Sequence, residues 1–233
     1  MENPEKDAFR DRPIRTFGRT GGRALSPRQQ QLYETRLDHW RVPDPAGAPL
    51  DPRGLFPAAR EVWLEIGFGG GEHLVAQAKA HPGNGFIGCE PFVEGVAKAI
   101  AGIEDNALAN VRLWPDDARL LLAALPDRSI ARAFILFPDP WPKRRQQKRR
   151  LVQPDFVTEL VRVLAPGARL RFATDVSSYA DEALLAFLGN GELEWNATRA
   201  DDWRRPPADH VTTRYESKRL GDCDPIWYDL ICT

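Results

Sequence analysis

The fold class is best read from Val62-Trp-Leu-Glu-Ile-Gly-Phe-Gly-Gly-Gly-Glu-His73, in which a glycine-rich turn joins a short, mostly apolar segment to a predicted helix. The first five residues of this stretch predict a strand, and residues 72–79 predict a helix. Glycine lets the backbone turn sharply at that point, so that a ligand can closely approach the helix N-terminus. A strand and a helix joined in this order are the starting unit of a parallel α/β sheet.

Apolar strands and helices alternate along the chain on the C-terminal side of this turn. We expect strands at 62–66, 85–89, 111–114, 131–137, 168–173, 193–198 and 226–232, and helices at 28–40, 72–79, 93–103, 118–125, 154–164 and 179–188. The pattern predicts an α/β fold with a doubly wound, mostly parallel seven-stranded sheet, in which the last two strands form an antiparallel edge hairpin. Residues 27–233 are expected to form a single domain, and the Arg-rich, apolar-poor residues 1–26 a mobile arm.

The composition narrows the possible function classes. The net charge is only −1, so bulk charge gives no indication of nucleic acid, although cations are concentrated locally. The three cysteines are scattered and the four histidines lack metal-ligand spacing, which argues against a disulfide framework and a metal site. No apolar stretch is long enough to cross a bilayer, and the N-terminus lacks a signal-peptide core. We therefore expect a cytoplasmic protein with neither a membrane partner nor a metal.

Acidic residues accompany the first three predicted strands. The glycine spacing departs from the GxGxxG fingerprint of dinucleotide sites, since Glu72 breaks it. Glu65, in the first strand, suits a cationic ligand such as a sulfonium with an ammonium group better than a pyrophosphate. Glu90 closes the second strand, where a carboxylate can accept both ribose hydroxyls. Asp117, after the third strand, could accept an adenine amino group, although each acid could instead be a solvated strand-end or helix-capping residue.

A second informative stretch, Phe137-Pro-Asp-Pro-Trp-Pro-Lys-Arg-Arg-Gln-Gln-Lys-Arg-Arg150, follows the fourth predicted strand. It places Asp139 and Trp141 in a proline-rich frame, directly before six cations in the eight residues of the basic run (143–150). Those cations could neutralise several backbone phosphates and make binding depend on salt. Trp141 could stack on an unpaired base, as aromatic side chains of RNA-binding proteins do. The alternative is a solvated, exposed start of a basic helix.

These features together carry a family resemblance. The glycine turn and the three acids resemble class I S-adenosylmethionine methyltransferases, which have a Rossmann-like fold. The stretch from Phe137 closely resembles the signature of the bacterial tRNA (guanine-N7)-methyltransferases, and Thr174-Asp-Val-Ser-Ser-Tyr-Ala180 and Thr212-Thr-Arg-Tyr-Glu-Ser-Lys218 match two further segments of that family. The resemblance implies S-adenosylmethionine as cofactor, tRNA as partner, and methyl transfer to N7 of a guanosine in the variable loop. The chain would act as a monomer or a homodimer.

The resemblance also implies roles for individual positions. Asp139 matches the family's active-site acid and would also border the cofactor. The other implied positions are cofactor contacts (Glu65, Gly67, Glu90, Asp117), substrate contacts (Lys143, Asp175, Thr213, Arg214, Tyr215, Glu216) and RNA contacts (Arg144, Arg145, Lys148, Arg149, Arg150).

The chemistry of guanine N7 fits this set of residues. N7 carries an accessible lone pair and loses no proton on methylation, so positioning matters more than a strong base. Asp139 could stabilise the cationic product or accept hydrogen bonds from the guanine edge, for which Glu216 is the other candidate. Three alternatives stay open: an exocyclic-amine methyltransferase, since Asp139-Pro-Trp-Pro142 loosely resembles the Asp/Asn-Pro-Pro-aromatic motif, a non-catalytic RNA-binding module, and a nicotinamide dehydrogenase.

Overall fold

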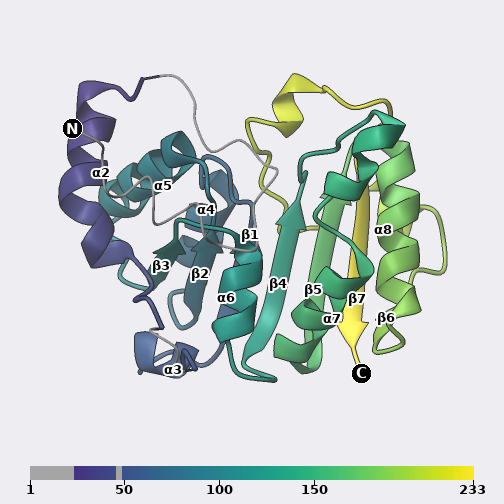
Figure 1. The fold of residues 1–233 in the computed structure, drawn as a ribbon, viewed down its shortest axis with the longest axis horizontal. Coiled ribbons are helices and arrows are strands. Elements are labelled where there is room, and N and C mark those ends of the chain that lie inside the picture. The colour runs from purple at the N-terminus through teal and green to yellow at the C-terminus, as the bar shows by residue number, and fades with distance from the viewer. Residues whose placement is uncertain (1–23, 46–48) are drawn as a thin grey trace.

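The computed structural model describes residues 24–45 and 49–233, within which seven strands form one sheet (Figure 1). The strand order is β3-β2-β1-β4-β5-β7-β6, and only β7 runs antiparallel to its neighbours. The predicted doubly wound, mostly parallel sheet with an antiparallel edge is therefore confirmed. The strands are β1 (Val62–Ile66), β2 (Gly85–Cys89), β3 (Val111–Trp114), β4 (Ile130–Leu136), β5 (Leu164–Thr174), β6 (Leu193–Trp195) and β7 (Ile226–Cys232).

The longer helices lie where the sequence predicts them, and several short ones are additional. The α-helices are α2 (Pro27–Trp40), α3 (Pro52–Leu55), α4 (Glu72–Ala80), α5 (Val93–Asp105), α6 (Ala118–Ala124), α7 (Pro154–Val163), α8 (Ser177–Gly189) and α9 (Asp201–Arg204), and the 3₁₀ helices are η1 (Arg144–Arg149) and η2 (Glu216–Lys218). Among the described residues, no helix is long and apolar enough to cross a membrane. The arm expected at 1–26 lies outside the described residues, except for 24–26.

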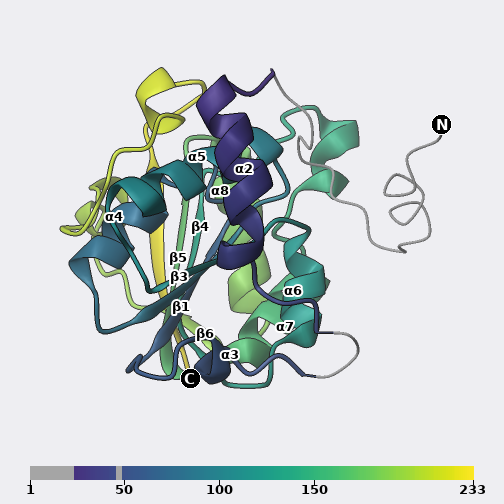
Figure 2. The same cartoon turned by 90° about the vertical axis from the view of Figure 1, so that its left-hand side faces the viewer.

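Helices cover both faces of the sheet, which explains why its central strands are mostly apolar. Every residue of β1 is buried, and alternate side chains enter two different cores. Trp63 packs in the core formed with α2, α4 and α5, whereas Leu64 packs in the core formed with α6, α7 and α8 (Figure 2). A strand with two buried faces is apolar on both of them, and Val62–Ile66 follows this pattern at every position except Glu65.

An ion-pair network fastens the segment between β6 and β7 to the sheet. Arg171 of β5 pairs with Asp209 at 2.6 Å and with Asp229 of β7 at 2.6 Å. Arg132 of β4 pairs with the other oxygen of Asp209 at 2.9 Å. Partial burial raises the pKa of Asp209, but its hydrogen bonds and proximity to the two arginines outweigh burial and lower the pKa to about 2. Because Asp209 stays charged at neutral pH, the network fixes the chain shortly before residues 213–216.

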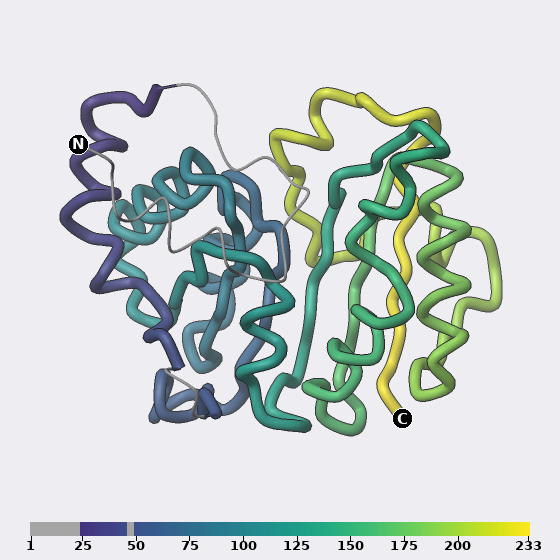
Figure 3. The backbone as a smooth tube through the Cα atoms, viewed as in Figure 1, coloured from purple at the N-terminus to yellow at the C-terminus, as the bar shows by residue number. Residues whose placement is uncertain are grey.

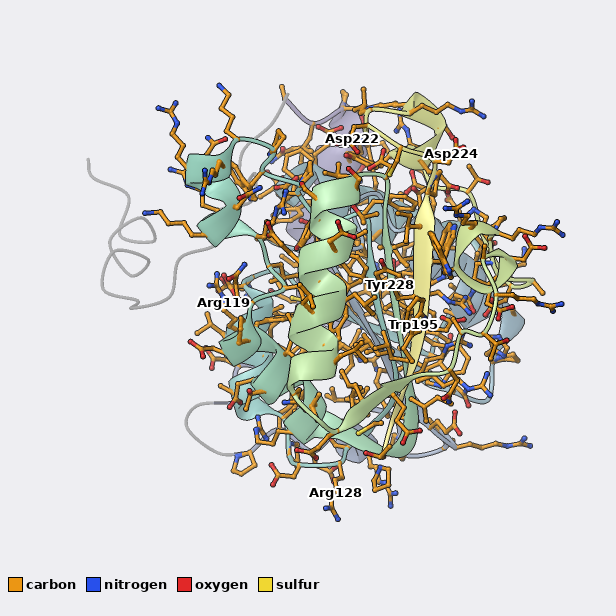
Figure 4. All side chains as sticks on the ribbon, turned by 90° about the vertical axis from the view of Figure 1, so that its right-hand side faces the viewer. Arg119, Arg128, Trp195, Asp222, Asp224 and Tyr228 are labelled. Atoms are coloured by element: carbon orange, nitrogen blue, oxygen red, sulfur yellow. The ribbon has the colours of Figure 1, made fainter. Side chains whose placement is uncertain are left out.

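The parallel strands point their carboxyl ends to one end of the molecule. In Figure 1 that end lies at the top, where η1 and η2 also lie. The tube in Figure 3 shows the chain after β4 and the chain before β7 rising to this same end. Asp222 and Asp224 lie there as well, whereas Arg128 lies at the opposite end (Figure 4). The segments that the sequence indicates for function, namely the glycine-rich turn, the stretch from Phe137 and the segments 174–180 and 212–218, thus lie at one edge of the sheet.

Candidate active site at the carboxyl edge of the sheet

The glycine turn (67–71) is open on one side and tightly packed on another. Gly67, Gly69 and Gly71 have φ values of +76°, +56° and +80°, a conformation that L side chains rarely adopt. A Cβ added to Gly67 or Gly69 would meet no atom of the described residues within 4 Å. In contrast, a Cβ on Gly95 of α5 would lie 2.2 Å from the carbonyl oxygen of Gly69. The close approach of α5 holds the turn, and the space beside Gly67 and Gly69 can admit a ligand.

Glu65 lies buried at the base of this turn and is joined to a histidine. Its Oε2 is 2.7 Å from Nδ1 of His73, and the two side chains are only 5% and 2% exposed. The ring of His73 also packs edge-on against Phe134 at 4.7 Å. No pattern in the sequence indicates this partner, because residues 65 and 73 meet only once the strand, the turn and the helix have folded back on one another.

Glu90 ties the end of β2 to the glycine turn. Its Oε2 accepts the N–H of Gly69 at 2.8 Å, and its Oε1 accepts the N–H of Phe92 at 3.0 Å. Burial raises the pKa of Glu90 to about 7 against the effect of these two hydrogen bonds, and the nearby charges of Asp139 and Glu65 raise it further. Three of the predicted acids thus lie close enough to influence one another, an arrangement that favours a cationic ligand.

Asp117 has the helix-capping role that the sequence left open. It is the N-cap of α6 and accepts the backbone N–H of Arg119 at 2.9 Å. The guanidinium of Arg119 pairs with its other oxygen at 2.6 Å. Asp117 is buried at the carboxyl end of β3, next in the sheet to the β2 strand that ends before Glu90.

The segment 137–141 has an unusual backbone at both of its ends. Phe137 and Trp141 have φ values of +51° and +42°, which is uncommon outside glycine and clusters at functional sites. The ring of Phe137 is buried against Tyr215, with ring centroids 5.8 Å apart. Asp139, between these two residues, has an exposed side chain. The segment therefore holds an accessible carboxylate on a constrained backbone.

Asp175 and Tyr215 lie in the same neighbourhood as Asp139. Asp175 is buried just after β5, and its Oδ2 accepts the N–H of Gly221 at 2.8 Å. Burial raises the pKa of Tyr215, and the nearby charges of Asp175 and Asp139 raise it further. The fold thus brings together residues from three segments far apart in the chain.

The segment 213–216 is organised around Glu216. Thr213 Oγ1 accepts the N–H of Glu216 at 3.2 Å, and Glu216 Oε2 lies 3.0 Å from Nε2 of His210. His210 in turn packs edge-on against Trp227 at 4.6 Å, while Arg214 is exposed. His210, like His73, gave no recognisable signal in the sequence, because its partner is identified only by the folded loop.

Most of the basic run is available to an anionic partner. Lys143, Arg144, Arg145 and Lys148 are exposed, and no carboxylate among the described residues forms an ion pair with any of these four. The guanidinium of Arg149 lies over the ring of Trp141, 5.1 Å from its centroid. In the described parts of the chain, no group of three or more His, Cys, Asp or Glu side chains could hold a metal ion.

Arg150, which the sequence groups with the cations expected to contact RNA, is placed differently from the others. The Arg150 side chain is fully buried, with 0% exposure. It is turned inward because its guanidinium bonds to Pro140, Ser178 and Glu182. A run of cations in a sequence cannot reveal which member faces inward, since that depends on the direction of the last turn of η1.

Comparison with known proteins agrees with this geometry. Residues 59–227 match a family model described as "Putative methyltransferase". The tRNA (guanine-N(7)-)-methyltransferase of Hyphomonas neptunium is 63% identical over 93% of this chain and 98% of its own length. The protein of the same name from Caulobacter sp. strain K31 is 53% identical over 94% of this chain and 95% of its own.

Solved structures show the same fold at low identity. The 16S rRNA methyltransferase KamB is 14% identical, with a TM-score of 0.57 over 78% of this chain and 92% of that one. A 16S rRNA (adenine(1408)-N(1))-methyltransferase from Catenulisporales acidiphilia is 13% identical, with a TM-score of 0.52 over 92% of this chain and 97% of that one. From the near-complete match to its close relatives, we conclude that the chain belongs to the tRNA (guanine-N7)-methyltransferase family.

Proposed function

We propose that this protein transfers the methyl group of S-adenosylmethionine to N7 of a guanosine in the variable loop of tRNA. The observation that carries the proposal is the position of Asp139. Its charge acts on Glu90, beside the glycine turn, and also on Tyr215, in the C-terminal segment. Asp139 thus lies between the two halves of the candidate site, where the methyl donor and the acceptor base would meet.

The residues around the glycine turn fit the methyl donor. Space beside Gly67 and Gly69 can admit a ligand against the backbone, and the buried Glu65 offers a carboxylate to an ammonium group. Glu90 has two oxygens for ribose hydroxyls, and Asp117 lies at the next strand end for the adenine amine. When bound, S-adenosylmethionine supplies an electrophilic methyl group on its sulfonium.

The acceptor side needs to hold guanine and to tolerate a positive charge. Methylation at N7 leaves the purine cationic, and carboxylates at Asp139 and Asp175 would stabilise that charge. Glu216 would accept hydrogen bonds from the N1–H and the exocyclic amine of guanine. No proton leaves N7, so these residues act by orientation and electrostatics, with no general base required.

The exposed cations suit the tRNA backbone. Lys143, Arg144, Arg145 and Lys148 extend from the same segment as Asp139, so phosphates bound there would bring a nearby base to the site. Trp141, half-buried under Arg149, offers an aromatic face for an unstacked base.

Nucleoside analysis tests the proposal. The purified protein is incubated with methyl-labelled S-adenosylmethionine and unmodified tRNA, and the RNA is then digested to nucleosides. We expect the label in 7-methylguanosine and, in fragments, within the variable loop. Label in an N2- or N6-methylated nucleoside would favour the exocyclic-amine reading. Absence of both methyl transfer and S-adenosylmethionine binding would favour an RNA-binding module.

A further inference from the structure

Arg150 has an environment unlike that of any other cation in the basic run. It is the last residue of that run, yet its side chain is fully buried, whereas Arg144 and Arg145 are exposed. A buried guanidinium requires partners for its N–H groups, because an unpaired buried charge is strongly unfavourable.

Its partners come from two segments of the candidate site. Nε donates to the carbonyl oxygen of Pro140 at 2.9 Å. Nη1 donates to the carbonyl oxygen of Ser178 at 3.1 Å, and Nη2 donates to Ser178 Oγ at 2.9 Å. Nη1 also pairs with Glu182 Oε2 at 2.6 Å, and the guanidinium carbon lies 4.7 Å from the ring centroid of Tyr179. The planar fork of arginine can satisfy several acceptors at fixed angles, which a lysine ammonium cannot.

These contacts join the two backbone segments that carry the substrate-side acids. Pro140 directly follows Asp139, and Ser178 lies three residues after Asp175 at the start of α8. The neighbouring N–H of Val152 donates to the hydroxyl of Tyr179 at 3.2 Å, which adds a second tie between the end of the basic run and α8. The left-handed conformation of Trp141, one residue beyond Pro140, is the kind that persists only when its surroundings hold it.

We propose that Arg150 is a positioning residue: it fixes Asp139 relative to Asp175 and does not contact RNA. The inference rests on the proposed methyl transfer for its kinetic readout. Its physical basis is that Pro140 directly follows Asp139, so the position of the Pro140 backbone sets where the Asp139 side chain begins. Arg150 connects that backbone to the rigid start of α8.

The role predicts a kinetic signature opposite to that of an RNA-binding cation. Arg150→Lys keeps the charge but loses the fork, so kcat at saturating tRNA should fall by at least about tenfold, as small misplacements of catalytic groups do. Arg150→Gln should lower kcat similarly. In both variants the salt dependence of tRNA binding and the affinity for S-adenosylmethionine should match those of the wild type.

Two matched variants make the comparison specific. Arg145→Gln removes an exposed cation of η1. It should reduce the slope of log K against log salt by about one, the change expected for the loss of one phosphate contact. Arg53→Lys, on α3 at the opposite end of the sheet, should behave like the wild type in every assay. Rates are normalised to the amount of protein that binds S-adenosylmethionine, so that a partly unfolded sample does not imitate a loss of kcat.

The Ser178→Ala variant keeps the proposal testable if Arg150 variants fold poorly. It removes only the Oγ acceptor, and it should also lower kcat without changing the salt slope. In the double variant Arg150→Lys/Ser178→Ala, the loss of kcat should be no larger than that of the greater single change, because both act through one contact.

Two results would overturn the proposal. The first is a salt slope that falls in Arg150→Gln as it does in Arg145→Gln, with kcat retained, since Arg150 would then bind phosphate. The second is an unchanged kcat in both Arg150→Lys and Ser178→Ala. Failure of the methyl-transfer proposal itself is distinguishable, because the wild type would then form no 7-methylguanosine, while the salt slopes would still decide whether Arg150 contacts RNA.

Discussion

Among single residues, Glu90 gives the site a measurable pH dependence. Its pKa rises from 4.5 to about 7 in the folded protein, so between these values the folded chain holds a proton that the unfolded chain has lost. Stability therefore falls as pH rises from about 4.5 to about 7, by an amount on the order of 3 kcal/mol. Glu90→Gln should lack this component.

Urea unfolding across that pH range checks the prediction for Glu90. The free energy of unfolding of the variant, minus that of the wild type, should increase as pH rises through the window, because only the wild type loses stability there. Gln offers one carbonyl oxygen to the two N–H groups of Gly69 and Phe92, so the variant should be less stable than the wild type by an amount that does not depend on pH. The change with pH in the stability difference between the two proteins is therefore the quantity that reports on Glu90. Parallel stability curves for the two proteins would show that Glu90 titrates normally.

Asp139 is the residue on which methyl transfer should depend most. Replacing it with Ala removes the carboxylate between the two halves of the site, and we expect single-turnover methylation to slow by roughly 100-fold, with the Kd for S-adenosylmethionine changed far less. Asp139→Asn keeps an acceptor without the charge. If the activity of Asp139→Asn is closer to that of Asp139→Ala than to that of the wild type, the charge of Asp139 is what matters. Near-normal methylation by Asp139→Ala would show that Asp139 is not needed for methyl transfer.

The sequence was least informative about the contacts of individual side chains. Glu65, Glu90 and Asp139 could be found because each occurs at a recognisable place relative to a strand. His73, the partner of Glu65, and His210, the partner of Glu216, could not be found, since each meets its acid only through tertiary structure. The burial of Arg150 could not be predicted either. Its neighbours in the sequence include exposed cations, whereas its neighbours in space are Pro140, Ser178 and Tyr179.

Among the secondary-structure elements, η1 should bind the phosphates of the tRNA backbone. Neutralising Arg144, Arg145 and Lys148 together to Gln removes three exposed cations, so the salt slope of tRNA binding should flatten by about two to three and the KM for tRNA should rise. Affinity for S-adenosylmethionine, measured by calorimetry without RNA, should not change. An unaltered slope would place the RNA on another surface.

The packing of α5 on the glycine turn gives a second prediction for an element. A methyl group at Gly95 would clash with the carbonyl oxygen of Gly69 at 2.2 Å, so Gly95→Ala must displace the turn or the helix. We expect a loss of about 1–3 kcal/mol in stability and weaker binding of S-adenosylmethionine. Gly54→Ala, where a Cβ has open space, is the control. Equal cofactor affinity in the two variants would contradict a role for this contact.

Elements with strong periodicity or a long apolar run could be predicted, and short ones could not. The seven strands and six longer helices follow from burial patterns that extend over several residues. By contrast, α3 and α9 have four residues each and η2 has three, too few to show a period. Pro166 and Gly167, expected to precede the fifth strand, lie within β5, where the pairing register with β4 shifts.

Over the whole molecule, the order β3-β2-β1-β4-β5 explains why one edge holds the site. Strand order reverses between β1 and β4, so the glycine turn after β1 lies beside the 137–141 segment after β4. The antiparallel β7 then returns the C-terminal segment to the same end (Figure 1). The alternation of strands and helices predicts that the strand ends meet at this edge of the sheet. The position of residues 205–216 could not be predicted, because it depends on the ion pairs of Arg132 and Arg171 with Asp209.

Methyl transfer to N7 can be tested by replacing that single atom in the tRNA. A tRNA transcript made with 7-deazaguanosine has a C–H group in place of N7 and keeps the exocyclic amine. We predict that the protein methylates the ordinary transcript to 7-methylguanosine and transfers no methyl group to the 7-deaza transcript, while both compete for binding. Equal methyl incorporation into the two transcripts would show that the methyl group is transferred to an atom other than N7.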